Sequence, residues 1–408
     1  MKKFLAILLT CTIVFTIGMF ALSNRNETEI SVSPVYSGNT EETIEAMEAE
    51  FATAERIAEE ASENPVKDNK GNAFGYVVVT DTIPADGKTD VADMLQALID
   101  ANPNRTIYFP DGIYLLSHPI YTPADPAKSV DLQLSNYAII RASSDFEGEA
   151  LVILGGKDAK NDTHTVGSNY ALEGGILDGS GKTNGVVIAG GRETAIRQVS
   201  IKHTIVGIHV KYGANSGSSD ADINDVNIIG TGGTNSVGVI VEGWDNTFTN
   251  MRIGNVFIGF HVKTSANCLT NIHPLYYSDY TDYENSAGFL DEGGNNIYNF
   301  CYSDQFGNAF ITTGDVSSIY DNCFCYWYSE AGHREVAFKA DKFNSVVDNL
   351  RCGFRYDTRD NNHVLIAEKS GGIGEFDTVL VENHKVASST HNLYKEGSVY
   401  SFFAKLFA

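Results

Sequence analysis

A recurring cell of apolar and polar residues in the second half of the chain constrains the fold more than any other feature. In each cell an apolar residue is followed two positions later by Asn, Asp or Gln, and this polar member recurs at steps of 27, 25, 21, 28, 22 and 27 residues. Such self-similarity is typical of solenoid folds. The seven cells are Ile196-Arg197-Gln198, Ile223-Asn224-Asp225, Phe248-Thr249-Asn250, Leu269-Thr270-Asn271, Ile297-Tyr298-Asn299, Ile319-Tyr320-Asp321 and Val346-Val347-Asp348.

Each step has the length of one coil of a parallel β-helix, in which three short strands are joined by bends of variable length. Identical positions in successive coils lie about 4.8 Å apart, so we expect the polar column to form a ladder that satisfies backbone groups in the bends. We expect the apolar companions to point inward and form the core. Cys301 and Cys323 take matching places, as do Cys325 and Cys352, which predicts stacked core thiols.

A short helix and several strands are predicted where the coils begin. Asp90 can cap a helix over residues 91–101 that has Met94, Leu95, Leu98 and Ile99 on one face. A strand over residues 76–79 precedes this helix, and strands over 106–109 and 113–116 follow it around the turn 110–112. We expect residues from about 120 to 386 to form at least eight coils, with the helix closing their N-terminal end.

Four segments here carry a family resemblance: Asp86-Gly87-Lys88-Thr89-Asp90, residues 96–101, Tyr108-Phe109-Pro110-Asp111-Gly112-Ile113-Tyr114, and Ile176-Leu177-Asp178-Gly179. They resemble the entry segment of the pectate-lyase-like superfamily, which includes polygalacturonase and rhamnogalacturonase relatives, epimerases and phage tailspikes. The resemblance implies an all-β fold, a right-handed parallel β-helix, and a polysaccharide or glycan as partner. It leaves the reaction and the oligomeric state open, a homotrimer included.

The N-terminus has the order of an export signal. Lys2 and Lys3 precede an uncharged stretch over residues 4–23, and Ala21-Leu22-Ser23 fits a cleavage site. Without cleavage, the same stretch is long enough to anchor the chain in a membrane. Either outcome predicts a secreted or cell-surface protein. The expected organisation is a signal or anchor (1–23), a polar linker (24–39), an amphipathic helix over about 40–62 with its linker (40–74), the β-helix (75–390) and a C-terminal cap (391–408).

The charge and cysteine content restrict the partners. The formal net charge is −23, which argues against nucleic acid and favours neutral sugars, unless a local Arg cluster or bound cations bridge to a polyanion. The five cysteines beyond the signal are odd in number and lack zinc-ligand spacing, so we predict neither a disulfide framework nor a zinc site. No cofactor is predicted, apart from calcium at Asp220, Asp222 and Asp225, which as acidic turn residues are more often simply solvated.

Motifs for a defined reaction are absent from the sequence. It has no nucleophile elbow, zincin motif, P-loop or EF-hand loop, and it lacks the Asn-Thr-Asp, Asp-Asp, Gly-His-Gly and Arg-Ile-Lys signatures of polygalacturonases. The leading prediction is therefore a glycoside hydrolase of this β-helix group with its own carboxylate pair. The alternatives are a polysaccharide lyase or epimerase, and a non-catalytic glycan-binding module of the tailspike kind.

A triplet Tyr-Ser-Asp/Glu supplies the candidate carboxylates. Its acids, Asp279, Asp304 and Glu330, are 25 and 26 residues apart, and Asp357 follows after 27 more. If each step is one coil, the acids form a column on one outer face. Neighbouring carboxylates would then lie about 5 Å apart and next-neighbours about 10 Å apart, which covers the separations of the two catalytic carboxylates in glycosidases. We predict Asp304 and Glu330 as the catalytic pair, with Asp279 tuning their electrostatics.

Aromatic and basic residues around the triplets are the predicted substrate contacts. Aromatic faces suit sugar rings, and arginine can clamp a uronate carboxylate, although salt bridges to nearby acids are the more ordinary role. The predicted contacts are Tyr277, Tyr302, Trp327, Tyr328, His333, Arg334, Arg355 and Asp357.

Overall fold

The structure is a computed structural model, and it divides the chain into two units, Met1–Asn39 and Thr40–Ala408. All described residues belong to the second unit, and from residue 340 onward only the backbone is described. The described residues are 48, 51–52, 55–56, 58–59, 62–63, 75–125, 128–157, 171–190, 193–211, 220–276, 282–314, 316, 318–327, 336–340, 346–348, 350–354, 364–368, 375–376 and 379–382.

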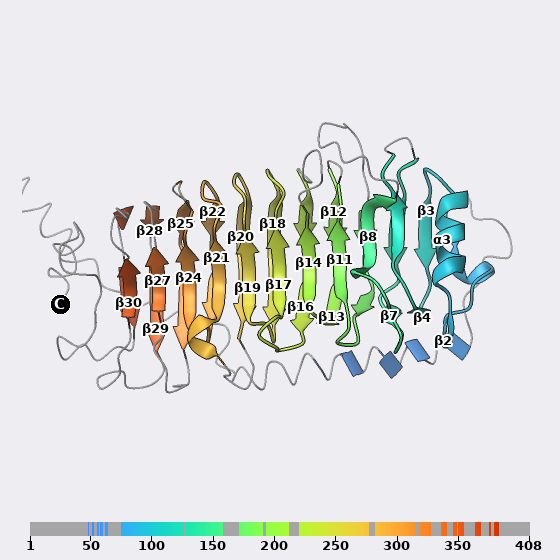
Figure 1. The fold of residues 1–408 in the computed structure, drawn as a ribbon, viewed down its shortest axis with the longest axis horizontal. Helices are drawn as coiled ribbons and strands as arrows, with labels where there is room; N and C mark the ends of the chain where they lie inside the picture. The colour runs from blue at the N-terminus through green and yellow to red at the C-terminus, as the bar shows by residue number, and fades with distance from the viewer. Residues whose placement is uncertain are drawn as a thin grey trace, which may run out of the picture. The chain divides into compact units, whose positions relative to one another are not determined.

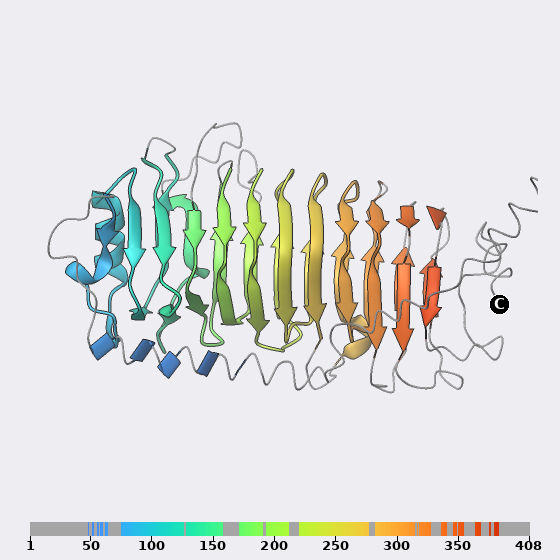
Figure 2. The ribbon, with the colours of Figure 1, turned by 180° about the vertical axis from the view of Figure 1, so that it is seen from behind.

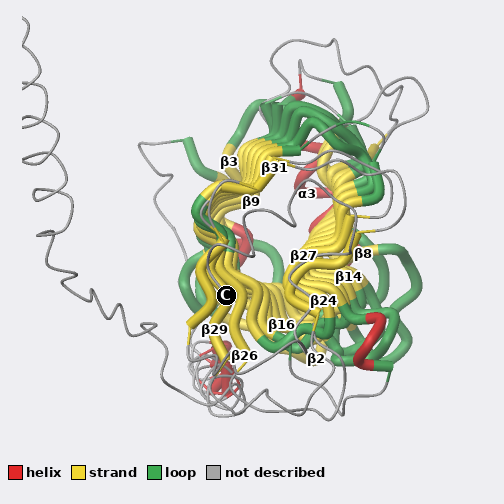
Figure 3. Tube along the Cα trace, turned by 90° about the vertical axis from the view of Figure 1, so that its left-hand side faces the viewer, coloured by secondary structure: helices red, strands yellow, loops and turns green. Residues whose placement is uncertain are grey.

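The second unit is a right-handed parallel β-helix, as the sequence predicts (Figure 1). Three stacks of parallel strands surround one core, and each coil contributes a strand to each stack in turn (Figure 3). The third stack has ten strands, so the prediction of at least eight coils is confirmed. These strands are β5 (Ile120–Pro123), β8 (Ala150–Lys157), β11 (Asn184–Ile188), β14 (Val206–Val210), β17 (Val237–Val241), β19 (Ile258–Val262), β21 (Ala287–Asp291), β24 (Asn308–Thr312), β27 (Val336–Ala340) and β30 (Val364–Glu368).

The first two stacks are joined by two long strands, β18 (Thr247–Gly254) and β20 (Cys268–Leu275), which run through both. The other first-stack strands are β1 (Val77–Val78), β3 (Thr106–Phe109), β6 (Asp131–Leu134), β9 (Ala171–Glu173), β12 (Ala195–Arg197), β15 (Asp222–Asn224), β22 (Ile297–Asn299), β25 (Ile319–Asp321), β28 (Val346–Asp348) and β31 (Glu375–Phe376). The other second-stack strands are β2 (Asp86–Asp90), β4 (Gly112–Leu116), β7 (Ala138–Ala142), β10 (Ile176–Asp178), β13 (Ser200–Thr204), β16 (Asn227–Gly230), β23 (Tyr302–Asp304), β26 (Phe324–Trp327), β29 (Leu350–Phe354) and β32 (Val379–Glu382).

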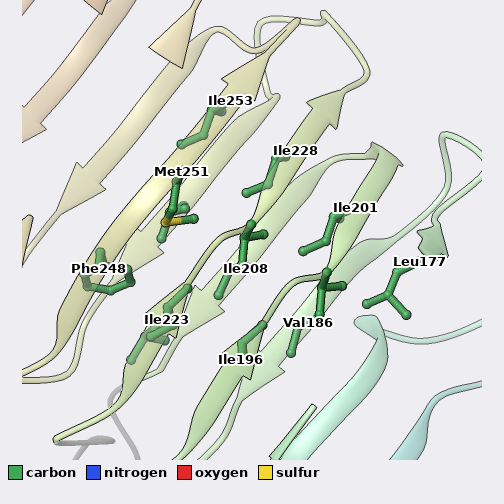
Figure 4. Close-up of a cluster of buried hydrophobic side chains, with 14 of the residues drawn as sticks. Leu177, Val186, Ile196, Ile201, Ile208, Ile223, Ile228, Phe248, Met251 and Ile253 are labelled. Carbon is green, nitrogen blue, oxygen red and sulfur yellow. The ribbon is translucent and has the colours of Figure 1, made fainter. Parts of the chain in front are cut away.

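The core is a set of aligned apolar columns, because successive side chains of a strand point to opposite faces. In Figure 4, Ile196, Ile223 and Phe248 from the first stack face Leu177 and Ile201 from the second. Burying such side chains provides the main stabilisation, at about 25 cal/mol per Å² of apolar surface. The outward positions that alternate with these columns are therefore free to carry function.

Helix α3 (Ala92–Ala101) closes the N-terminal end of the coils, as predicted (Figure 1). The Asp90 carboxylate accepts a hydrogen bond from the backbone N–H of Ala92, 3.2 Å away, and Leu95 and Ile99 are fully buried. Met94 was expected on the same apolar face, but its side chain is 41% exposed, so that expectation is wrong. The helix buries a narrow stripe because it covers one end of the coils rather than lying in a groove.

The strand register confirms four of the seven predicted cells and corrects the others. Arg197, Asn224, Thr249 and Thr270, the middle residues of the first four cells, are register partners. Thr270 then pairs with Asn299, which is the last residue of its cell, so the last three cells are shifted by one residue. A shift of one residue exchanges the inner and outer faces. Tyr298 and Tyr320 are therefore buried and stacked 4.5 Å apart, whereas Ile297 and Ile319, which were expected inside, are 44% and 42% exposed.

The predicted polar ladder occupies the bend that follows the first stack. Gln198, Asp225, Asn250 and Asn271 all have a left-handed backbone there, with φ between 54° and 56°. Asn and Asp tolerate this conformation well. The Asn271 amide donates to the Asn250 side chain over 2.8 Å, so neighbouring coils are linked. After the register shift, Phe300 takes this position at φ 52° and is 59% exposed.

Cys268, Cys301, Cys323 and Cys325 are free thiols. Cys301, Cys323 and Cys325 are buried, and burial raises the pKa of the Cys301 thiol. Cys325 and Cys352 are register partners on β26 and β29. The predicted stacking in matching places therefore holds for their strand positions.

An N-terminal helix lies across the coils in the region where the amphipathic helix was predicted. Its described residues between 48 and 63 run along the row of coils beside the second stack (Figures 1 and 2, dark blue). Phe51 and Ala58 are buried against Ile113, Ile139 and Ile176, in a cluster separate from the main core. Within the part of the chain that the structure describes, no helix is both long and apolar enough to cross a membrane.

Candidate functional site

The second stack has two adjacent columns of residues at strand positions that alternate with the core positions. We call these two columns the outer face. Its first column runs through Ile113, Ile139, Ile176, Ser200, Asn227, Arg252, His273, Tyr302, Phe324 and Arg351. Its second column runs through Leu115, Arg141, Asp178, Lys202, Ile229, Gly254, Leu275, Asp304, Tyr326 and Gly353. Two groups of polar residues on this face form candidate sites.

The first candidate site surrounds Asp304 at the end of β23. Tyr302 donates a hydrogen bond from its hydroxyl to Asp304 Oδ2 over 3.1 Å, and His273 Nε2 lies 3.8 Å from the same oxygen. The His273 and Tyr302 rings stack with centroids 4.1 Å apart. Asp304 is 6% exposed, and its Oδ1 has no hydrogen-bond partner among the described residues. A buried carboxylate oxygen without a donor is costly, so Asp304 keeps an unmet hydrogen-bond acceptor at this place in the fold.

Aromatic rings continue this site across the next coil. Phe324 follows Tyr302 at 4.7 Å, and Tyr326 lies 5.9 Å from Phe324. All three rings are partly exposed. Burial, with the Asp304 charge beside it, raises the pKa of Tyr302 far above its usual range, so its hydroxyl stays protonated and acts as a donor. A short row of rings beside a carboxylate suits the faces and hydroxyls of a sugar chain.

The predicted column of acids is wrong in its register. The strand partners of Asp304 are Leu275 on β20 and Tyr326 on β26, not Asp279 and Glu330. The triplet spacing misleads because bends differ in length: Tyr302 opens a strand, whereas Tyr277 and Tyr328 come after β20 and β26 have ended. Near-equal steps therefore do not imply equal positions.

Trp327 is not the exposed stacking platform that we expected. Its side chain is 1% exposed, and its Nε1 donates to the backbone carbonyl of Phe306 over 2.8 Å. It therefore belongs to the main hydrophobic core.

Most other predicted site residues lie outside the described residues, so their predictions stand untested. These are Asp279, Glu330, Tyr277, Tyr328, His333, Arg334, Arg355 and Asp357.

The second candidate site, around Asp178 on β10, was not predicted. Arg141 Nε donates to Asp178 Oδ2 over 2.8 Å, and His203 Nδ1 lies 3.1 Å from Asp178 Oδ1. The other sides of these two cations face the N-terminal helix, with Arg141 Nη2 2.5 Å from Glu55 and His203 Nε2 3.1 Å from Glu48. In the sequence, the segment Ile176-Leu177-Asp178-Gly179 contributed only to the family resemblance. The step from Asp178 to His203, which has the length of one coil, was the signal that could have pointed to this site.

The charges at this second site shift one another. Burial alone would raise the pKa of Asp178, but the His203 hydrogen bond and the Arg141 charge lower it. The hydrogen bond and charge of Asp178, together with Glu48, raise the pKa of His203 despite its burial. Ionised Asp178 and protonated His203 therefore stabilise each other.

The described residues contain no group of three or more His, Cys, Asp or Glu side chains that could hold a metal ion. Of the acids considered for calcium, Asp222 pairs with Arg197 at 3.2 Å. Its carboxylate has a structural partner, so the geometry lends calcium no support there.

The fold and its outer face define a class, the right-handed parallel β-helix proteins. The model of the rhamnogalacturonase A/epimerase, pectate lyase-like family matches residues 78–298, more than half of the chain. The chain belongs to this family. A comparison with curated proteins by sequence finds no match.

Solved structures show the same fold at low identity. The tailspike protein of E. coli bacteriophage HK620, in complex with a pentasaccharide, is 12% identical with a TM-score of 0.59, over 82% of this chain and 70% of that one. Endo-xylogalacturonan hydrolase from Aspergillus tubingensis is 14% identical with a TM-score of 0.53, over 75% and 93%. The tailspike protein gp49 from Acinetobacter baumannii bacteriophage Fri1, a capsular polysaccharide depolymerase, is 10% identical with a TM-score of 0.50, over 83% and 67%.

Proposed function

We propose that this chain is an extracytoplasmic glycoside hydrolase that binds and cleaves a polysaccharide on the outer face around Asp304. The observation that carries the proposal is the buried Asp304 carboxylate, one oxygen of which has no hydrogen-bond partner among the described residues, at the start of a row of aromatic rings. The similar structures include a hydrolase and a depolymerase of polysaccharides, which supports this class of substrate. The predicted export signal over residues 1–23 supports the location.

The second carboxylate of the proposed pair is Glu330, with Asp279 as the neighbouring acid. Each follows three residues after the last described residue of its segment, Trp327 and Tyr276 respectively. Three residues span at most about 10 Å, and Trp327 and Tyr276 belong to the coils on either side of β23. Both acids are therefore within reach of Asp304 by chain length.

The Tyr302 hydroxyl and the His273 ring fix the orientation of Asp304 through Oδ2, which leaves Oδ1 as the atom that would carry the proton of a general acid. Glu330 then serves as the base or nucleophile on the opposite side of the sugar. The separation of the two carboxylates decides between inversion and retention.

The test is to screen the purified protein against plant, fungal and bacterial polysaccharides for release of reducing ends, and then to assay Asp304→Asn and Glu330→Gln on the substrate found. Each variant should lose about 100- to 10,000-fold in turnover while keeping the fold. Asp245→Asn is the control, because Asp245 is exposed and its left-handed backbone suits Asn. Full activity in both variants would contradict the proposal.

Two other functions give different outcomes in the same assay. A non-catalytic glycan-binding module would use the aromatic row without any acid pair, and would show binding without turnover. A polysaccharide lyase or epimerase would use an arginine base, and Arg252 and Arg351 share the first column with Tyr302. An unsaturated uronate product would identify the lyase.

A further inference from the structure

The site around Asp178 is organised by the coils themselves. Asp178 is 4% exposed and receives Arg141 Nε, the backbone N–H of Ser180 at 3.0 Å, and His203 at 3.1 Å. Each of these partners comes from β7, β13 or the turn after β10. Because the N-terminal helix contributes none of them, the site keeps its arrangement when the helix is absent.

The helix places two carboxylates on this site at the spacing of the coils. Glu55 Oε1 meets Arg141 Nη2 at 2.5 Å, and Glu48 Oε2 meets His203 Nε2 at 3.1 Å. Seven helical residues rise about 10.5 Å, and β7 and β13 are two coils, or about 9.6 Å, apart. The two glutamates therefore fill the outer sides of two cations that Asp178 has already oriented.

The helix is attached through a small apolar contact. Phe51 and Ala58 are its buried apolar residues among those described, and they belong to the cluster with Ile113, Ile139 and Ile176 rather than to the main core. Phe51 also meets the edge of His203, with centroids 5.1 Å apart. The helix can therefore leave without opening the core of the coils.

Removal of the helix would uncover a local excess of positive charge on a chain of net charge −23. Arg141 and protonated His203 flank Asp178, and Lys202 is the register partner of Asp178 on β13. Two cations beside one carboxylate, Arg141 and protonated His203 on Asp178, leave a positive charge that attracts a further carboxylate, and arginine binds it with directed hydrogen bonds.

We infer that the N-terminal helix is an autoinhibitory contact. Glu48 and Glu55 occupy a carboxylate-binding site made by Arg141 and His203, and an acidic glycan takes this site when the helix is displaced. That the ligand is a glycan rests on the proposed function, whereas the carboxylate site and the helix that covers it do not.

The test compares the full chain with Glu48→Gln/Glu55→Gln, using Glu59→Gln as the control because Glu59 is an exposed glutamate of the same helix. Trypsin cleavage after Arg56 measures helix release. Titration with an oligomer of galacturonic acid, and with its neutral methyl ester, measures the uncovered site. We expect the double variant to be cleaved roughly tenfold faster and to gain binding of the acid oligomer at least tenfold over the wild type. Glu59→Gln should change neither.

Adding Arg141→Gln to the double variant should abolish the gained binding, and Arg141→Lys should restore part of it, with circular dichroism checking the fold. Unchanged trypsin cleavage in the double variant would overturn the autoinhibitory contact. Faster cleavage without binding, or equal binding of the methyl ester, would overturn the carboxylate site. None of these outcomes depends on hydrolysis, so a failure of the proposed function at Asp304 is recognised separately.

Discussion

The outer face has two halves that differ in what covers them. In the coils of β4, β7, β10 and β13, the N-terminal helix buries apolar Ile113, Ile139 and Ile176, and it pairs with Arg141 and His203. In the coils of β20, β23 and β26, the same columns carry partly exposed His273, Tyr302 and Phe324 beside Asp304. One strand position therefore serves as a docking surface in the first half and as a candidate ligand surface in the second.

This difference shows that the role of an outward position in a solenoid depends on whether another segment packs over it. The strands of both halves pair in the same way and bury the same kind of core. The coils act as a regular scaffold, and the N-terminal helix breaks their equivalence. The predictions below substitute residues of the outer face or packed against it, and the first three set each substitution beside a matched one elsewhere in the coils.

The largest expected effect comes from removing the arginine that pairs with the buried Asp178 carboxylate in the covered half. Arg141→Met leaves the Asp178 carboxylate without its arginine, although His203 and the Ser180 N–H remain, so unfolding should become easier by about 3 kcal/mol. Arg252→Met makes the same change at an exposed position of the outer face, and should cost about 0.5 kcal/mol or less. Denaturant melts of both variants test this, and equal losses would show that the covered half is not special.

A pair of phenylalanine truncations separates helix docking from ligand binding. Phe51→Ala removes a buried ring from the cluster under the helix, and should weaken helix docking by about 2 kcal/mol, seen as faster hydrogen exchange in residues 48–63. Phe324→Ala removes a partly exposed ring, and should instead weaken glycan binding about 3- to 10-fold with little change in stability. If Phe324→Ala destabilises the protein as much as a core truncation, its ring is structural and the ligand surface is wrong.

Removal of the Tyr302 hydroxyl tests the half of the outer face that carries Asp304. Tyr302→Phe deletes the donor to Asp304 Oδ2 while keeping the ring stacked on His273. A hydrogen bond to a charged group contributes about 1.5 to 3 kcal/mol, so turnover should fall roughly tenfold or more. Tyr108→Phe, on the first stack, is the control and should leave activity unchanged. Undiminished activity in Tyr302→Phe would mean that its hydroxyl does not orient a catalytic carboxylate.

The smallest effect is the pH dependence of the covered half. The pKa of His203 is raised above its ordinary 6.5, so its contribution to stability is complete below that pH and is lost as the pH rises through the raised value. The pKa of Asp178 is lowered below its ordinary 3.8, so its contribution is complete above that pH and is lost as the pH falls through the lowered value.

Helix docking should therefore be tightest between about pH 4 and 6.5. Glu48, Glu55, Arg141 and Lys202 are the other charged groups around this pair. Hydrogen exchange of the helix across pH measures the window. His203→Gln should remove the loss of helix docking above about pH 6.5, a change of about 1 kcal/mol or less. If the loss of docking at alkaline pH persists in this variant, another group causes it.

The amino-acid sequence by itself determined the fold and the helix that closes its N-terminal end. The repeating cells predict the coils because each apolar position must find an apolar neighbour one strand spacing away. Local signals also predict the helix that closes the coils, since Asp90, Leu95 and Ile99 act within one or two turns. The amphipathic helix predicted over about 40–62 was readable in the same way, and Phe51 of its apolar face is buried.

Only the tertiary structure decided the site. Asp304 was a candidate from the sequence and Tyr302 lies two residues before it on β23, but the nearness of His273 depends on the register between β20 and β23, and the triplet spacing placed that register four residues away from the true one. Trp327 was misplaced because side chains alternate along β26, so Trp327 points into the core while its neighbour Tyr326 lies on the outer face. The Asp178 cluster joins residues up to 155 positions apart, such as Glu48 and His203. Bend lengths vary freely at little energetic cost, so spacing alone cannot tell which side chains meet, whereas burial of the core sets the register that brings them together.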